Sequence, residues 1–166
     1  MGLSVPFNGD LSLVASLDAA IVSGVYGREN SKSDGGGRAS QHEFISEETL
    51  REAIKICRQK GISFGYVFNS PFAHLGMFTP KEIGGLDQKI RWIEEIGADL
   101  IIVAGPALLM KYKPRTNLRF GISKFHRTKT LAGLQYLIGM GADRVCLDLN
   151  VTRNFSMLDA MQKNFP

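Results

Sequence analysis

Short apolar runs and amphipathic helical patterns alternate along the whole chain. The apolar runs are rich in β-branched and aromatic residues and most end at glycine or asparagine, which is typical of buried strands. Between them, apolar residues recur three or four positions apart, which is typical of helices packed on a sheet. The pattern predicts strands at 3–7, 19–26, 62–68, 98–105, 118–123 and 145–149.

Capping residues mark the helices that separate these strands. Ser46 can accept a hydrogen bond at a helix start, and Gly61 is suited to end that helix. Thr79 followed by Pro80 gives a second start signal, and Gly97 a second stop. We therefore predict helices at 11–17, 46–60, 79–96, from 106, at 128–140, and from 154 or 156.

Strands that alternate with helices indicate an α/β protein with a parallel sheet and right-handed crossovers. The sequence Gly-Ala-Asp occurs twice, at 97–99 and 141–143, each time between a helix and a strand. This regular repetition favours a TIM-barrel-like β/α repeat, incomplete at about six units of the eight in a full barrel. An open, doubly wound sheet shows the same alternation and stays as the alternative. We expect residues 1–166 to form a single, partial barrel domain.

Composition narrows the class of protein. The chain has 166 residues, of which 44% are hydrophobic, and no apolar run approaches the roughly 20 residues of a membrane span. The amino terminus lacks a secretory signal pattern, so we expect a cytoplasmic protein without a membrane partner. The net charge of +4 suits an anionic ligand and, more weakly, a nucleic acid.

Cysteines, histidines and glycines give little sign of a cofactor. Cys57 and Cys146 lie within apolar patterns and are expected to be buried, reduced core thiols. His42, His74 and His126 lack the spacing of metal ligands. Residues 28–44 are polar, and we predict a long mobile loop; its glycine-rich part, 35–40, lacks the phosphate-loop pattern. We expect no cofactor and no metal.

In either architecture a ligand site lies at the carboxyl ends of the strands. Asp148 interrupts an apolar run and Asn69 follows one, which makes them the candidate catalytic residues. Asp148 could equally pair with a neighbouring loop, and Asn69 could belong to a Ser-Pro turn. The candidate substrate-binding residues on the same rim are Asn8, Tyr26, Arg28, Lys124, Arg127 and Asn150.

Basic residues flank the fifth predicted strand on both sides. Those at 111, 113, 115 and 119 precede or enter it, whereas those at 124, 126, 127 and 129 follow it and belong on the rim. Lys124 and Arg127 could clamp a carboxylate or phosphate, because a guanidinium makes bidentate contacts with such groups. Solvated surface charge is the alternative interpretation.

Several segments resemble, in order and spacing, the amino-terminal half of peptidase family U32, also called the collagenase-like proteases. The resemblance covers nearly the whole chain. It rests on VPFNGD at 5–10, VSGVYG at 22–27, LREAIKICRQKG at 50–61, YVFN at 66–69, GADLIIV with GPALL at 97–109, and GADRVCL at 141–147.

The resemblance implies a TIM-like barrel and activities that range from proteolysis to oxygen-independent hydroxylation in ubiquinone biosynthesis and modification of RNA bases. Hydroxylation-linked members hold an iron–sulfur cluster through cysteines that lie mostly beyond the region matched here. This chain has no such cysteine cluster, and it has FGISK at 120–124 where the family has an LSTQ-type strand. It also ends before the last two barrel units.

Three functional hypotheses follow. The first is a U32-like protein, a protease or hydroxylation-linked member, that binds a peptide or small molecule at the strand carboxyl ends. In this hypothesis a second copy or a partner subunit completes the barrel, because exposed strand edges promote association. The second is a nonenzymatic binding or assembly subunit, favoured by the missing cluster cysteines and the lack of an evident catalytic set. The third is an unrelated barrel enzyme that acts on a small anionic metabolite.

Overall fold

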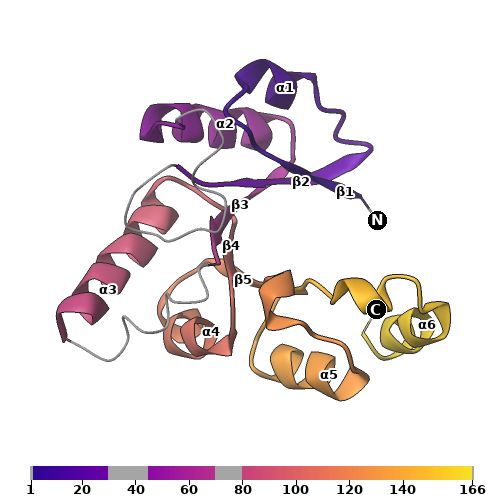
Figure 1. Ribbon diagram of the computed structural model, residues 1–166. Coiled ribbons are helices and arrows are strands. Elements are labelled where there is room, and N and C mark those ends of the chain that lie inside the picture. Colours follow the sequence, from indigo (N-terminus) through magenta and orange to yellow (C-terminus); the bar gives the residue numbers. More distant parts are fainter. Residues whose placement is uncertain (1, 30–44, 70–79, 166) are drawn as a thin grey trace.

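Six parallel strands, paired in the order in which they occur along the chain, curl into an incomplete barrel (Figure 1). The computed structural model describes residues 2–29, 45–69 and 80–165. The strands are β1 (Leu3–Pro6), β2 (Val22–Gly27), β3 (Ser63–Phe68), β4 (Leu100–Val103), β5 (Arg119–Ile122) and β6 (Arg144–Val145).

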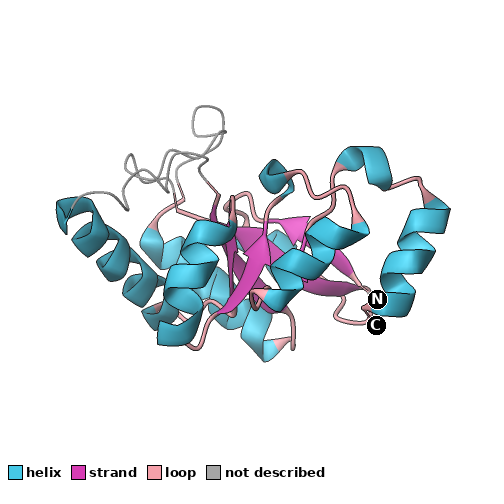
Figure 2. Cartoon of the chain, turned by 90° about the horizontal axis from the view of Figure 1, so that it is seen from below, coloured by secondary structure: helices cyan, strands magenta, loops and turns pink. Residues whose placement is uncertain are grey.

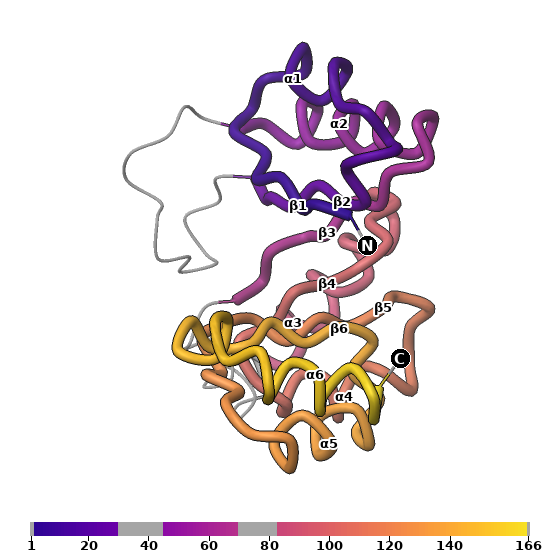
Figure 3. Tube along the Cα trace, turned by 90° about the vertical axis from the view of Figure 1, so that its right-hand side faces the viewer, coloured from indigo at the N-terminus to yellow at the C-terminus, as the bar shows by residue number. Residues whose placement is uncertain are grey.

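The helices lie along the outside of the curled sheet (Figure 2). They are α1 (Leu11–Ser16), α2 (Glu47–Gln59), α3 (Pro80–Glu95), α4 (Pro106–Tyr112), α5 (Leu131–Gly139) and α6 (Phe155–Asn164). A doubly wound sheet would reverse its strand order and carry helices on both faces. The unbroken order from β1 to β6 therefore decides for the barrel-like arrangement (Figure 3).

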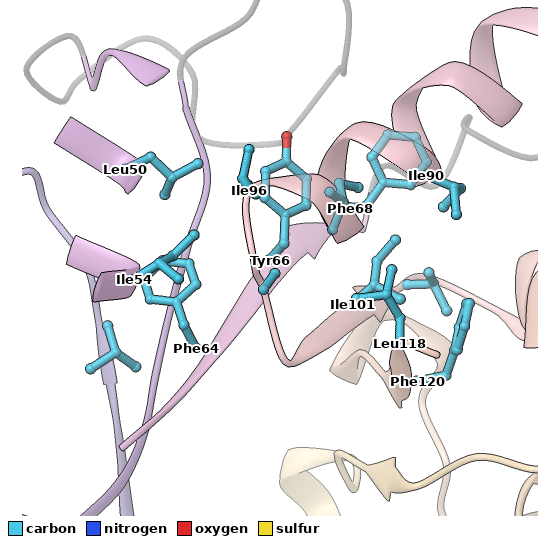
Figure 4. Packing of buried hydrophobic residues seen from close by; sticks show 14 of the residues in the cluster. Leu50, Ile54, Phe64, Tyr66, Phe68, Ile90, Ile96, Ile101, Leu118 and Phe120 are labelled. Atoms are coloured by element: carbon cyan, nitrogen blue, oxygen red, sulfur yellow. The ribbon is translucent and has the colours of Figure 1, made fainter. Parts of the chain in front are cut away.

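The hydrophobic core fills the space between the outer face of the sheet and the helices (Figure 4). Alternate strand residues face it, among them Phe64, Tyr66 and Phe120, whose side chains are fully buried. From the helices, Leu50 and Ile54 of α2 pack against this face. Fully burying one such large apolar side chain contributes about 1.5–3 kcal/mol, so this layer holds the helices on the sheet.

The two Gly-Ala-Asp segments form the same turn at the amino-terminal ends of the strands. Asp99 donates its N–H to the carbonyl of Phe64 at 2.9 Å, and its carboxylate accepts the N–H of Phe64 at 2.8 Å. In the second turn, Asp143 donates its N–H to the carbonyl of Phe120 at 2.9 Å, and its carboxylate accepts the N–H of Phe120 at 2.7 Å. The glycine that opens each turn has a positive φ, 84° and 93°, which few other residues adopt without strain. Each aspartate thus ties its own strand to the preceding one.

The structure corrects several predicted boundaries near the last two strands. The predicted helix 128–140 begins only at Leu131, because Thr128 forms a β-bridge with Leu147 and Thr130 caps the helix. The predicted strand 145–149 ends at Val145, and a 3-10 helix, η4 (Leu149–Val151), follows. β4 is also shorter than the predicted run 98–105.

The prediction for the cysteines is half wrong. Cys57 is buried in α2, but Cys146 is exposed. Val145 packs against the core, so Cys146, which follows the end of β6, points to the inner side of the sheet, at an edge where no further strand pairs within the described structure. Thr79, His42, His74 and most of the predicted loop, including 35–40, lie outside the described residues. Among the described helices, none has the length and apolar character needed to cross a membrane.

Candidate ligand site at the strand carboxyl ends

Asn69 and Ser123 join the carboxyl ends of two strands that are separated by β4. The side-chain amide of Asn69 donates to the hydroxyl oxygen of Ser123 at 3.3 Å. Ser123 is buried and also accepts the N–H of Phe125 at 3.4 Å, which starts the 3-10 turn Lys124–His126. The predicted rim residue Asn69 is therefore placed beside the start of the segment that follows β5.

Asp148 anchors the segment that follows β6. Its side chain is 8% exposed, and it accepts the N–H of Asn150 at 2.9 Å and a bond from Nε of Arg127 at 3.4 Å. Lys129 lies 4.0 Å away. The hydrogen bond from the Asn150 backbone, supported by the two cations, lowers the pKa of Asp148 against the opposing effect of burial. A carboxylate that is ionised and satisfied in this way favours the structural interpretation of Asp148 over general acid catalysis.

The segment between β5 and α5 projects several cations into solvent. Arg127 has φ 57° and ψ 45°, and among the described residues no other non-glycine has a positive φ. A left-handed conformation costs such a residue about 1–2 kcal/mol, so the surrounding turn must hold it in place. The Arg127 N–H donates to the carbonyl of Lys124 at 3.0 Å. The exposed side chains here are Lys124, Phe125, Arg127 and Lys129, which we call the basic arc.

The charge around the basic arc is strongly one-sided. From residue 100 to residue 142 the sequence contains seven lysines and arginines and no aspartate or glutamate. Lys111 is paired with Asp87 and Lys113 with Asp143, both away from the rim. Among the described residues, the carboxylate in contact with the basic arc is that of Asp148, which is shared between two cations. The arc therefore keeps a positive field at the carboxyl ends of β5 and β6.

The other predicted binding residues do not join the basic arc through any contact within the described ranges. Asn8 accepts the N–H of Asp10 at 3.1 Å, and Asp10 in turn caps α1. Tyr26 is exposed at the end of β2, with Arg28 half-buried two residues later. Asn150 is exposed beside Asp148 and contributes its backbone to that carboxylate. Asn8 thus has a local turn role, and Asn150 borders the arc.

Sequence reasoning missed a part-buried network centred on Glu29. Tyr66 donates its hydroxyl to Glu29 at 2.6 Å, and Lys89 forms an ion pair with the same carboxylate at 2.5 Å. The Lys89 ammonium also lies 3.9 Å from the ring centroid of Trp92. The spacing of Lys89 and Trp92 on one helix face was visible in the sequence, but the pairing of Lys89 with Glu29, 60 residues away, was not. The network fastens Glu29, which lies within the predicted loop 28–44, to β3 and α3.

The described rim has acceptors and cations but no assembled nucleophile and base. Within the described residues, the hydroxyl of Ser123 contacts Asn69 and Phe125, and His126 makes no side-chain hydrogen bond to it. The exposed Sγ of Cys146 has one weak contact, 3.9 Å from the carbonyl of Leu147. The geometry here is suited to holding an anion.

Comparison with known proteins decides the family. The model of peptidase family U32 matches residues 14–159. The chain belongs to peptidase family U32. The resemblance deduced from the sequence is thereby confirmed, and the match spans every strand after β1.

Solved structures agree with this U32 assignment at the level of the fold. The U32 peptidase Mk0906 aligns with 100% of this chain at a TM-score of 0.77 and 14% identity, and the chain spans 66% of that protein's length. A 2,3-dimethylmalate lyase of the PEP mutase/isocitrate lyase superfamily aligns at a TM-score of 0.57 and 8% identity. The alignment covers 96% of this chain and 56% of the lyase. Oxaloacetate acetylhydrolase aligns at a TM-score of 0.55 and 11% identity, and the alignment covers 98% of this chain and 58% of the hydrolase. No curated protein sequence matches. At these identities the likeness shows a shared fold alone.

Proposed function

We propose that this U32 family member binds a small anionic ligand at the carboxyl ends of β5 and β6. The observation that carries the proposal is the basic arc, in which a left-handed Arg127 and the exposed Lys129 flank one buried carboxylate and the exposed Lys124 lies in the same segment. The carboxylate of Asp148 orients Arg127 through Nε. A guanidinium has further N–H donors on its terminal nitrogens, and such donors suit a carboxylate or phosphate.

Neighbouring groups would give such a ligand its orientation. Asn69 lies beside the start of the same segment through its bond to Ser123. Phe125, which is 49% exposed, offers an apolar face within the arc. Exposed ion pairs each contribute only about 0–1 kcal/mol, so we expect millimolar binding of simple anions and tighter binding only of a ligand that contacts several of these groups.

Binding is tested by calorimetric titration with inorganic phosphate and with succinate at low ionic strength. Lys124→Ala and Arg127→Ala should each weaken binding by about two- to fivefold, and the double variant by more. Lys55→Ala is the matched control, because Lys55 is an exposed lysine of α2 that pairs with Glu52 of its own helix. If Lys55→Ala weakened anion binding as much as the other two variants do, the loss of affinity would come from net charge alone, and the basic arc would not be a binding site.

Peptide hydrolysis is the second candidate function, and the family match is the observation that favours it. An anionic ligand in that case would be a peptide carboxylate. We expect that Asn69→Ala and Ser123→Ala abolish cleavage of a fluorogenic peptide library if the rim carries the reaction. If the folded parent chain cleaves no peptide while it binds phosphate, the binding role stands without the peptidase role.

A further inference from the structure

One long side chain connects the two edges of the curled sheet. Arg144, the first residue of β6, donates from Nη2 to the hydroxyl oxygen of Ser4 in β1 at 3.2 Å. These strands occupy opposite ends of the strand order and share no backbone pairing (Figure 3). The contact therefore crosses the inner side of the sheet between residues 140 positions apart.

Small residues on the inner face make room for this crossing. Ser4, Gly24 and Ser63 are register partners across β1, β2 and β3. A Cβ atom added at Gly24 would lie 3.2 Å from Oγ of Ser63 and 3.7 Å from Nη1 of Arg144. At the other edge, Gly121 is the register partner of Arg144, and a Cβ there would lie 3.7 Å from Cβ of Arg144. The guanidinium thus rests over the glycine of β2 on its way to β1.

Arg119, the first residue of β5, is an arginine at the same end of the sheet that contacts the adjoining strand. It is exposed on β5, and its Nε donates to the carbonyl of Asp99 at 3.4 Å, next to the adjoining strand β4. Arg144 instead extends past the strands between to reach the opposite edge. Ordering a long arginine side chain in this way costs rotamer entropy. The contact that holds it in place also restrains the two strands that it joins.

We propose that Arg144 is a brace that holds β1 and β6 at a fixed separation and so sets the width of the opening between the two sheet edges. The brace is independent of the proposed anion site, which lies at the other end of the strands. Losing the guanidinium should let the sheet uncurl, because β1 and β6 have no hydrogen-bonded partner on their outer sides within the described structure.

The test is a distance measurement between spin labels by pulsed electron resonance. Labels are placed through Ala15→Cys on α1 and Gln135→Cys on α5, both exposed, in a Cys146→Ser background. Cys57 can stay, because burial raises the pKa of its thiol to about 11 and shields it from labelling. Arg144→Met keeps most of the side-chain volume and removes the donor; we expect a longer and broader distance distribution, whereas Arg119→Met should leave the distribution unchanged.

An Arg144→Met distribution identical to that of the parent overturns the brace, and so does an equal change in Arg119→Met. If Arg144→Met fails to fold, Ser4→Ala decides, since it deletes only the hydroxyl at an exposed position. A shift in the same direction as expected for Arg144→Met supports the brace, and an unchanged distribution in the folded Ser4→Ala variant overturns it.

Discussion

Asp143 and Asp148 stand five residues apart on either side of β6 and have different surroundings. Asp143 accepts the N–H of Phe120 and an ion pair from Lys113, and it repeats the geometry of Asp99 two strands earlier. Asp148 has no such counterpart in the part of the chain that the structure describes: it holds η4 and two solvent-facing cations. The amino-terminal ends of β4 and β6 thus share one repeated turn, whereas the carboxyl-terminal ends of β5 and β6 are built from individual contacts.

The difference shows how a barrel of this kind divides its tasks. The turn that occurs before β4 and again before β6 fastens each of these two strands to the preceding strand in the same way. Loops at the opposite end vary from unit to unit, so they can place cations, amides and aromatic rings where a ligand would lie. Residues at the two ends should therefore respond differently to substitution.

The largest expected effect is on the free energy of unfolding of Asp143→Ala. Removing the carboxylate leaves the N–H of Phe120, a fully buried residue, without its acceptor, which should cost about 1–3 kcal/mol. Asp99→Ala should cost a similar amount through Phe64. Urea denaturation measures both, and Asp143→Asn, which keeps an acceptor oxygen, serves as the control. A loss in Asp143→Asn as large as that in Asp143→Ala would assign the effect to charge instead.

A smaller effect is expected for Lys113→Ala, which separates the two contacts of Asp143. The ion pair is about one-third exposed on both sides, so its loss should cost about 0–1 kcal/mol in the same denaturation experiment. If Lys113→Ala destabilised the protein as much as Asp143→Ala, the backbone bond to Phe120 would not be the main contribution of the turn.

At the other end, Asp148→Asn should change the pH dependence of stability. The Asn150 N–H, with help from Lys129 and Arg127, lowers the pKa of Asp148 in the folded state. The stability that this carboxylate adds is therefore present above its unfolded pKa of about 3.9 and is lost as the pH falls through the folded pKa. The thermal midpoint of Asp148→Asn, followed from pH 7 to pH 3, should fall less steeply than that of the parent; equal slopes would contradict the structural role.

Much of the fold was readable from the sequence for the same reason that the amino-terminal ends are regular. Glycine stops and Gly-Ala-Asp segments predicted where helices end and strands begin, and the period of the apolar positions predicted which faces are buried. The shortness of β6 was not readable, because it depends on Thr128 pairing with Leu147 instead of entering α5. The exposure of Cys146 has the same origin, since an apolar pattern does not reveal that a strand lies at a sheet edge.

The candidate site was readable only in part. The sequence placed Asn69, Lys124, Arg127 and Asp148 on one rim, because residues that follow parallel strands share one end of the sheet. It could not show that Arg127 bonds to Asp148, or that Asn69 reaches Ser123, since both depend on side-chain directions in the loops. The bond from Tyr66 to Glu29 was hidden for the same reason, as Tyr66 lies on a core-facing position where an apolar role was the natural expectation.

The two ends of the barrel thus differ in role: the amino-terminal turns at β4 and β6 contribute to stability, and we propose that the basic arc binds an anion. Titrating inorganic phosphate into Lys124→Ala and Asp143→Ala at low ionic strength, under conditions where both are folded, separates the two roles. We predict that phosphate affinity falls in Lys124→Ala and stays at the parental value in Asp143→Ala. Unchanged affinity in Lys124→Ala, or a fall confined to Asp143→Ala, would contradict this division of tasks between the two ends of the barrel.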